Sequence, residues 1–250
     1  MTVAVVTGGS GGIGRACVER LAADGFEVVS VDLVAPAEVA PARHLSADLL
    51  DIEATVAAIR EACPKIGVLV NGAGIVERDT FDDVGLADWE RVVGVNARAP
   101  FFLLQGLADR MPPGSSVINI ASLEAVTVLA MSGATSSIYA STKAALRSLT
   151  ETLAAELGPR GIRVNAVAPG LIRTPLTAGA QADERDAWIR SHTPLGRWGE
   201  VGDIADVVGF LASPASRFMT GATLVVDGGI SLGQIRGSDS SPRGKPFAQG

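Results

Sequence analysis

Short apolar runs alternate with amphipathic segments along nearly the whole chain. Runs rich in β-branched residues occupy positions 3–6, 28–31, 68–70, 117–120, 164–167 and 224–226. Most of these runs are continuous, which is typical of strands covered on both faces. Helical periodicity covers 12–24, 51–62, 88–111, 139–157 and 201–211. This alternation predicts an α/β fold, a single-domain doubly wound parallel sheet with helices on both faces.

Two regions depart from the alternation. Residues 171–200 form a long mixed segment with a short helix predicted near 183–189, and we expect a lid over a substrate site. Residues 233–250 are rich in glycine, serine and proline and lack apolar periodicity. We expect this tail to be flexible or to lie over a neighbouring subunit. The predicted organisation is therefore a domain over 1–232 followed by a tail over 233–250.

Composition excludes several classes of function. With 250 residues and 47% hydrophobic content, the chain can bury a large core. A net charge of -6 argues against binding to nucleic acid or to an anionic membrane surface. Cys17 and Cys63 lack the spacing of a metal or redox motif and suit buried thiols in a reducing compartment. No apolar run is long enough to span a bilayer, and we expect a cytoplasmic protein without a signal peptide or bound metal.

The only tyrosine of the chain, Tyr139, lies four residues before Lys143 at the start of a predicted helix. At helical spacing the two residues share a stripe with Leu146, Leu153 and Leu157. A lysine on a core-facing stripe is costly unless its charge is needed there. One interpretation is a structural tyrosine beside a lysine that extends to water. The other is an acid/base pair, because an ammonium group near a phenol favours the phenolate.

A glycine-rich loop follows the first predicted strand and opens the first predicted helix. Its backbone amides and the helix N-terminus suit a pyrophosphate group. Two dinucleotide-binding registers fit the loop: Gly9, Gly11 and Gly14, or Gly8, Gly12 and Gly14. The loop also contains the Gly-x-Ser-x-Gly pattern of serine hydrolases around Ser10. A serine hydrolase would need an upstream oxyanion-hole loop, for which almost no chain is present, and only His44 or His192 could serve as its base. A P-loop is excluded because no Gly-Lys-Ser/Thr closes the loop.

An acidic residue ends the second predicted strand, about twenty residues after the glycines. The Asp32 carboxylate can there accept hydrogen bonds from both ribose hydroxyls of NAD. A 2′-phosphate would be repelled, and neither Gly11 nor Leu33 offers a compensating cation. The alternative is a strand-end aspartate that satisfies a turn. Together the loop and Asp32 predict a Rossmann fold that binds NAD.

Six motifs in register resemble the short-chain dehydrogenase/reductase family. They are Thr7-Gly8-x-x-x-Gly12-Ile13-Gly14, Asp32, Asn71-Gly72-Ala73-Gly74, Tyr139-x-x-x-Lys143, Pro169-Gly170 and Asp227-Gly228-Gly229. The resemblance runs from Thr7 to about Gly229 and selects the second glycine register. Gly72 departs from the family pattern, which has asparagine at that position.

The resemblance implies a catalytic tetrad of Asn96, Ser122, Tyr139 and Lys143. In this family the tyrosine is the general acid/base, and the lysine lowers its pKa and holds the nicotinamide ribose. Ser122 would orient the substrate oxygen, and Asn96 would anchor a water molecule that links Lys143 to solvent. Taken alone, Asn96 fits equally well as a satisfied polar group of the core.

The same resemblance implies a cofactor site and a substrate site. The implied substrate-binding residues are Ser122, Glu124 and Tyr139. Asp48 is expected at the adenine and Thr174 at the carboxamide. The full set of implied cofactor-binding residues is Gly8, Ser10, Gly12, Ile13, Gly14, Asp32, Leu33, Asp48, Leu49, Asn71, Gly72, Ala73, Gly74, Tyr139, Lys143, Pro169, Gly170, Ile172 and Thr174.

The spacing between serine and tyrosine departs from the family. Ser122 lies seventeen residues before Tyr139, where the family usually has about a dozen. Position thirteen residues back holds Val126 and position twelve holds Thr127. We assign the role to Ser122 because it ends the predicted strand. The extra residues are then expected to lengthen the loop through 131–135 beside the substrate.

The expected function is an NAD-dependent oxidoreductase that interconverts a secondary alcohol and a ketone, assembled as a homotetramer. One alternative is a 3-oxoacyl-carrier-protein reductase that uses NADPH, and another is a nicotinamide-binding sensor without turnover. Apolar residues expected at the site favour a largely apolar alcohol over a charged sugar acid. These residues are Val126, Leu129, Leu176 and Trp188.

Overall fold

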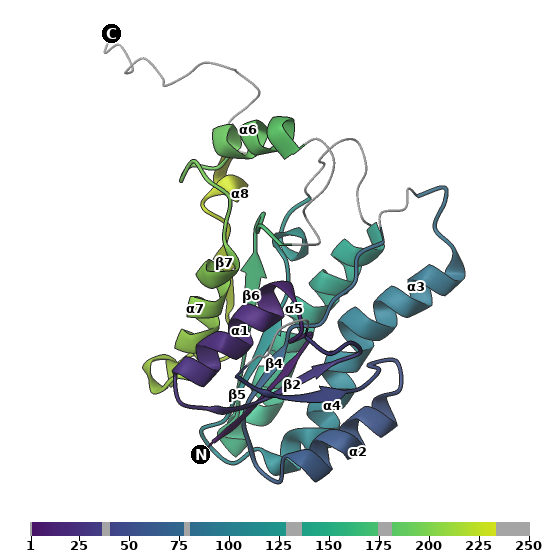
Figure 1. Ribbon diagram of the computed structural model, residues 1–250, viewed down its shortest axis with the longest axis vertical. Coiled ribbons are helices and arrows are strands. Elements are labelled where there is room, and N and C mark those ends of the chain that lie inside the picture. The colour runs from purple at the N-terminus through teal and green to yellow at the C-terminus, as the bar shows by residue number, and fades with distance from the viewer. Residues whose placement is uncertain (1, 37–40, 78–80, 129–136, 175–181, 234–250) are drawn as a thin grey trace.

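A seven-stranded parallel sheet forms the centre of the protein in the computed structural model (Figure 1). The structure describes residues 2–36, 41–77, 81–128, 137–174 and 182–233. The strands are β1 (Val3–Thr7), β2 (Glu27–Asp32), β3 (Arg43–Ser46), β4 (Ile66–Asn71), β5 (Ser116–Ile120), β6 (Arg163–Pro169) and β7 (Thr223–Val226). Their order in the sheet is β3-β2-β1-β4-β5-β6-β7. The order reverses between β1 and β4, and this confirms the predicted doubly wound fold.

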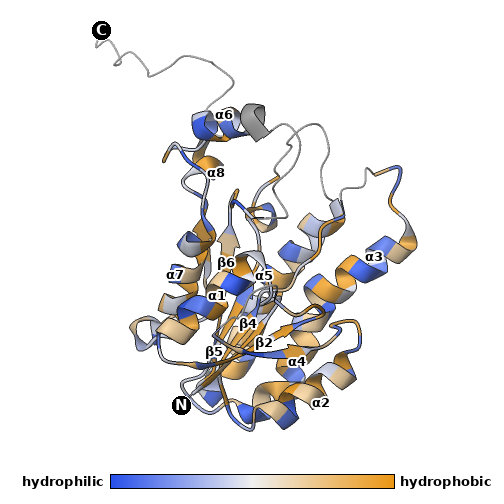
Figure 2. Ribbon diagram, viewed as in Figure 1, coloured by the Kyte–Doolittle hydropathy of each residue, from blue (hydrophilic) through white to orange (hydrophobic). Residues whose placement is uncertain are grey.

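Helices cover both faces of the sheet. They are α1 (Gly12–Ala23), α2 (Ile52–Ala62), α3 (Leu86–Val93), α4 (Ala99–Leu107), α5 (Ser137–Leu157), α6 (Ala182–His192), α7 (Val201–Ala212) and α8 (Ile230–Gly233). Helices α1 and α7 pack on one face, whereas α2, α4 and α5 pack on the other. Helix α6 lies beyond the carboxyl ends of the strands, and Figure 2 shows that its coloured part is largely hydrophilic.

The strand residues alternate between two apolar cores. Val6 and Val70 pack with Leu21 of α1 and with α7, while Val5 and Leu69 pack toward α2 and α4. The central strands therefore carry apolar residues on both faces, which is why their sequences are largely continuous apolar runs. The two free cysteines, Cys17 and Cys63, are buried one in each core, as predicted. Burial raises the pKa of the Cys17 thiol to about 12.

Two elements differ from the sequence prediction. Strand β3 was not predicted, because Arg43, His44 and Ser46 interrupt its apolar pattern. It is an edge strand that pairs with β2 alone, so it needs few apolar residues. The helix predicted over 88–111 is instead α3, a π-helical turn at Gly94–Arg98, α4 and a short 3-10 segment at Ala108–Arg110. No helix within the described residues is long and apolar enough to cross a membrane.

Close packing fixes the glycine loop between β1 and α1. A Cβ atom on Gly14 would lie 2.0 Å from the carbonyl oxygen of Gly8, and one on Gly8 would lie 2.7 Å from the backbone of Ala73. Gly8 also has a φ of +70°, which favours glycine. Gly11, by contrast, has no atom within 4 Å of an added Cβ. Gly9 is closely packed as well, because an added Cβ would lie 2.5 Å from the Ser30 hydroxyl oxygen. The close contacts therefore involve Gly8, Gly9 and Gly14, and they do not choose between the two registers.

This contrast predicts that Gly14→Ala destabilises the protein more than Gly11→Ala. The methyl group at position 14 must displace the Gly8 backbone, with an expected cost of about 1–3 kcal/mol. The thermal midpoint should fall by roughly 2–10 °C for Gly14→Ala. It should fall by less for Gly11→Ala, because the extended φ of -154° is open to alanine and only the weak preference of alanine for an N-cap counts against it. Equal midpoints for the two variants, measured by calorimetry, would contradict this account of the loop.

Candidate active site

A cleft of about 540 Å³ opens at the carboxyl ends of the strands, where the strand order reverses. Its walls combine the glycine loop, the ends of β2, β4, β5 and β6, and the start of α5. The lining residues are Gly8, Gly11, Gly12, Ile13, Gly14, Val31, Asp32, Leu33, Ala47, Asp48, Leu49, Gly72, Ala73, Gly74, Ile75, Val76, Val95, Ile120, Ala121, Ser122, Tyr139, Lys143, Pro169, Gly170, Ile172 and Thr174. Ligands bind at this position in doubly wound sheets.

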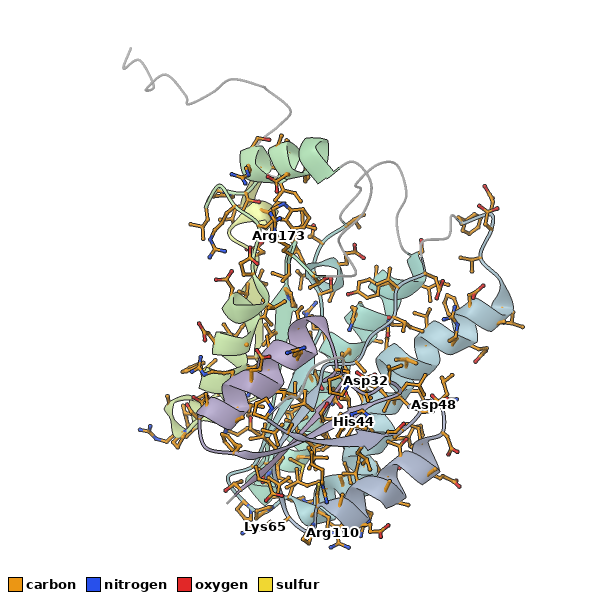
Figure 3. The ribbon with its side chains drawn as sticks, viewed as in Figure 1. Asp32, His44, Asp48, Lys65, Arg110 and Arg173 are labelled. Carbon is orange, nitrogen blue, oxygen red and sulfur yellow. The ribbon has the colours of Figure 1, made fainter. Side chains whose placement is uncertain are left out.

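Asp32 holds the glycine loop at one end of the cleft. One carboxylate oxygen accepts a hydrogen bond from the backbone N–H of Ser10 at 3.1 Å, and the other accepts from Val34 N–H at 3.4 Å. The Ser10 hydroxyl donates to the Val34 carbonyl at 2.6 Å. Asp32 thus satisfies a turn, as the structural interpretation predicts. It also lines the cleft, where a ribose could reach it. Figure 3 shows Asp32 and Asp48 toward the same edge of the sheet, with Arg173 near α6.

A threonine at the end of β1 ties the loop after β4 to the sheet. The Thr7 hydroxyl accepts hydrogen bonds from the backbone N–H groups of Gly72 and Ala73, at 3.2 and 3.3 Å. A Cβ atom on Gly72 would lie 2.7 Å from the Thr7 carbonyl oxygen. This contact explains why glycine suits the position at which the chain departs from the family pattern.

Lys143 is buried at the other end of the cleft, where several elements converge. Its ammonium group donates to the carbonyl of Ile120, the last residue of β5, at 2.8 Å. A Cβ atom on Gly74 would lie 3.2 Å from Nζ, so glycine leaves room for the lysine. Burial lowers the pKa of Lys143 to about 8. The predicted lysine on a core-facing stripe is therefore present, and it carries a destabilised charge.

Tyr139 lies one helical turn before Lys143, and Nζ of the lysine is 5.6 Å from the centre of the tyrosine ring. Burial raises the pKa of Tyr139 to about 12, a hydrogen bond with the Ser122 side chain lowers it, and the charge of Glu124 raises it. Ser122 also caps a 3-10 turn, because its hydroxyl oxygen accepts from Glu124 N–H at 3.1 Å. The structure thus brings Ser122, Tyr139 and Lys143 together.

Asn96 lies in the π-helical turn behind these residues. Its side chain pairs with both backbone groups of Ile75, donating to the carbonyl and accepting from the N–H, each at 2.9 Å. Its amide also donates to the Thr142 hydroxyl on α5 at 3.2 Å. Asn96 therefore connects the loop after β4 to the helix that carries Tyr139 and Lys143.

The π-helical turn has a signal in the sequence that the prediction of one continuous helix missed. Pro100 follows Asn96 by four residues and has no N–H to donate to the Asn96 carbonyl. Ala99 N–H instead bonds to the carbonyl five residues back, at Gly94. Such turns are frequent at functional sites. Thr142 was missed as well, because a helical threonine carries no pattern that marks it.

A chain of buried polar side chains lies beneath the cleft. The Asn71 amide donates to the Asn119 side chain at 2.8 Å, and Asn119 donates to the Thr150 hydroxyl at 2.9 Å. Thr150 in turn donates to the Leu146 carbonyl at 2.8 Å. This chain fixes the ends of β4 and β5 against α5. It places Asn71 under the floor of the cleft rather than in its lining.

Helix α6 is tied to the segment that follows β6. Asp186 accepts from Arg173 at 3.0 Å and from Arg190 at 2.7 Å, and these contacts lower the pKa of Asp186. The Arg173 guanidinium also lies 5.6 Å from the centre of the Trp198 ring. The short helix predicted near 183–189 is confirmed as α6. The ion pair joins α6 to Arg173, whose neighbour in sequence, Thr174, lines the cleft.

Most of the predicted site residues line the cleft. Six of the described ones lie outside its lining: Ser10, Asn71, Asn96, Glu124, and the expected apolar residues Val126 and Trp188. Eight lining residues were not predicted, namely Gly11, Val31, Ala47, Ile75, Val76, Val95, Ile120 and Ala121. The sequence could have indicated these residues by their position, since each lies next to a predicted site residue or continues the same segment. Leu129, Leu176, the loop through 131–135 and the tail after 233 lie outside the described residues. Among the residues that are described, no group of acidic, histidine or cysteine side chains could hold a metal ion.

Comparison with known proteins identifies the family. Residues 8–231 match the family model described as enoyl-(acyl carrier protein) reductase. An uncharacterised short-chain type dehydrogenase/reductase of Sinorhizobium fredii is 38% identical over 261 residues, across 99% of this chain. The chain spans only 47% of that relative's length. The fold and the site define a dinucleotide-binding α/β protein, and the chain belongs to the short-chain dehydrogenase/reductase family.

Two further proteins match over nearly their full length. The 3-alpha-(or 20-beta)-hydroxysteroid dehydrogenase of Mycobacterium bovis is 37% identical over 92% of this chain and 90% of its own. The crystal structure of a blue fluorescent protein from a metagenomic library, in complex with NADPH, superposes with a TM-score of 0.82 at 37% identity. The superposition covers 92% of this chain and 98% of the fluorescent protein's chain. The comparisons support an oxidoreductase that uses a nicotinamide cofactor.

The lowered pKa of Lys143 predicts a pH-dependent stability that Lys143→Met removes. Between pH 8 and 10.5 the unfolded chain keeps a proton that the folded protein has lost, so stability rises with pH. Raising the pH from about 7 to about 10 should therefore stabilise wild type by on the order of 1–3 kcal/mol more than Lys143→Met. Above pH 10 the raised pKa of Tyr139 acts in the opposite direction.

Urea unfolding at both pH values measures this difference, with the exposed lysine variant Lys65→Met as a control for loss of one positive charge. Identical pH dependence in wild type and Lys143→Met would contradict the burial of a destabilised charge.

Proposed function

We propose that the protein is an NAD-dependent dehydrogenase that interconverts a secondary alcohol and a ketone. One observation carries this proposal: Ser122, Tyr139 and Lys143 meet at one end of a cleft whose other end carries Asp32. An acid/base group and a site for a ribose are thereby placed in one continuous space. The family membership and the dehydrogenase names of the relatives agree with this chemistry.

The shape and chemistry of the cleft suit a dinucleotide. Close approach of the backbone at Gly8 and Gly14 leaves a loop of amide groups at the N-terminus of α1, where a pyrophosphate is favoured. Asp32 would hold the adenosine ribose, and Thr174 would contact the carboxamide end. When bound, NAD supplies the hydride acceptor, and its reduced form supplies the hydride. Among the residues lining the cleft, Lys143 is the only cation, and it lies at the end away from Asp32.

Tyr139 would exchange the proton of the substrate oxygen. In the direction of alcohol oxidation, the Tyr139 phenolate accepts the hydroxyl proton while the Ser122 hydroxyl holds the same oxygen. The pKa of Tyr139 near 12 is too high for this work at neutral pH. The ammonium group of Lys143 stabilises the phenolate, and the positive charge of a bound oxidised nicotinamide adds to this effect.

Asn96 would act from behind this pair. Its contacts with Ile75 and Thr142 fix the space behind Lys143, through which we propose that a water molecule passes protons to and from the lysine. In the direction of ketone reduction the same groups work in reverse, and Tyr139 donates its proton to the nascent alkoxide.

We also propose a homotetramer with a small-molecule alcohol or ketone as substrate. Exposed apolar side chains lie on two helices and on one edge strand of the sheet. Phe102 of α4, Phe210 of α7 and Val225 of β7 are exposed in the isolated chain. Strand β7 is one of the two edges of the sheet, and pairing would cover it.

Replacing the proposed acid/base residue gives the main test. Tyr139→Phe removes the phenol oxygen and keeps the ring, so NAD binding should survive while turnover falls by at least about 100-fold. Binding is followed by the fluorescence of NADH and turnover by its absorbance. Ser148→Ala, on the exposed face of the same helix, should keep wild-type activity. Unchanged turnover in Tyr139→Phe would refute the mechanism, and absence of turnover in wild type would favour a sensor.

Asp32 predicts a preference for NADH over NADPH. A 2′-phosphate next to this carboxylate is repelled, and we expect kcat/KM to favour NADH by at least about tenfold. Asp32→Ser should reduce that preference. Asp109→Asn, which removes an exposed carboxylate paired with Arg60, should leave it unchanged. A preference of wild type for NADPH would instead support the acyl-carrier-protein reductase alternative.

A further inference from the structure

One carboxylate oxygen beside the proposed catalytic residues has no partner. Oε2 of Glu124 is buried and accepts no hydrogen bond among the residues that the structure describes. Burial also raises the pKa of this carboxyl group. A buried acceptor without a donor is costly. A ligand group that donates to this atom during function would remove that cost.

The position of Glu124 is fixed by the residue that we assign to the substrate oxygen. The hydroxyl oxygen of Ser122 accepts from Glu124 N–H at 3.1 Å, so the 3-10 turn Leu123–Ala125 begins directly at the end of the cleft. The cleft lining reaches Ser122 and Tyr139, and Glu124 lies immediately beyond them. Two residues farther along, Val126 is exposed and apolar.

The charge of Glu124 opposes the proposed chemistry at Tyr139. A negative charge near the phenol disfavours the phenolate, and Glu124 is the residue that raises the pKa of Tyr139 in this way. Lys143, on the same helix as Tyr139, acts in the opposite sense. A hydrogen-bond donor or a positive charge placed against Glu124 would relieve this conflict and would also satisfy Oε2.

We propose that Glu124 determines substrate specificity by accepting a hydrogen bond from a donor group next to the reacting carbinol. This inference rests on the proposed alcohol dehydrogenase function and narrows its substrate to an alcohol that carries a second hydroxyl or an ammonium group. An anionic group at the same place would face the carboxylate and is disfavoured. Val126 leaves the remainder of such a substrate free to be apolar.

The test compares three probes with one ring and different donors: cyclohexanol, trans-1,2-cyclohexanediol and trans-2-aminocyclohexanol. We expect wild type to favour at least one donor-bearing probe over cyclohexanol by about tenfold or more in kcat/KM. Glu124→Leu should lose this ratio. Glu124→Gln, which still accepts a hydrogen bond, should keep a preference for the hydroxyl probe and lose one for the ammonium probe. These two variants therefore distinguish the two sources of the donor.

A matched control and a binding measurement complete the test. Glu61→Gln, at an exposed glutamate of α2, should keep the wild-type ratio. If none of the probes is oxidised, the same ratios are taken from their dissociation constants for the NAD complex. A ratio near one in wild type, a ratio unchanged in Glu124→Leu, or no binding of either donor-bearing probe overturns the proposal.

The pH profile separates a role at the site from a merely structural one. In Glu124→Gln the negative charge near Tyr139 is gone, so the rising limb of kcat/KM for cyclohexanol oxidation should move to lower pH. An unmoved limb counts against the proposal. The experiments distinguish a wrong role for Glu124 from a wrong proposed function. Loss of activity in Tyr139→Phe with unchanged ratios in Glu124→Leu would overturn this inference alone.

Discussion

The ammonium group of Lys143 is buried, and burying a charge costs free energy that hydrogen-bond partners and nearby dipoles offset. Its partner is the carbonyl of Ile120, which is available because β5 ends at that residue. Gly74 leaves space above it, and Asn96 holds the loop that contains Gly74. The ends of two strands, one helix and the π-helical turn are therefore positioned around a single charge.

The same charge bears on the proposed acid/base role of Tyr139. Burial makes this tyrosine hold its proton too tightly to act as a base at neutral pH, and in the proposed mechanism the nearby cation acts against that tendency. Burial has the opposite effect on the lysine, whose pKa it lowers. Two groups with opposite pKa shifts thus lie 5.6 Å apart, measured from Nζ to the ring centre, and shifted pKa values of this kind cluster at functional sites.

The apolar pattern was sufficient to predict most of the fold. Continuous runs predicted six of the seven strands: the five central strands, which are covered on both faces, and the edge strand β7. Strand β3 was missed because an edge strand packs little apolar surface. The helix over 88–111 was predicted without its interruption, because Pro100 disturbs the hydrogen bonding of the backbone and leaves the apolar periodicity intact.

The candidate site, like the fold, was predicted from the sequence only in part. The sequence by itself determined which chemical groups are present and at which strand ends they lie, because parallel strands bring their carboxyl ends to one edge of the sheet. Spacing singled out Tyr139, Lys143 and Asp32 as candidates, and the family resemblance suggested their roles. Only the tertiary structure decided the contacts between distant segments: Asn96 with Ile75 and Thr142, and Lys143 with Ile120. Burial and the resulting pKa shifts depend on packing across elements, and a linear pattern does not encode which buried atoms are left without partners.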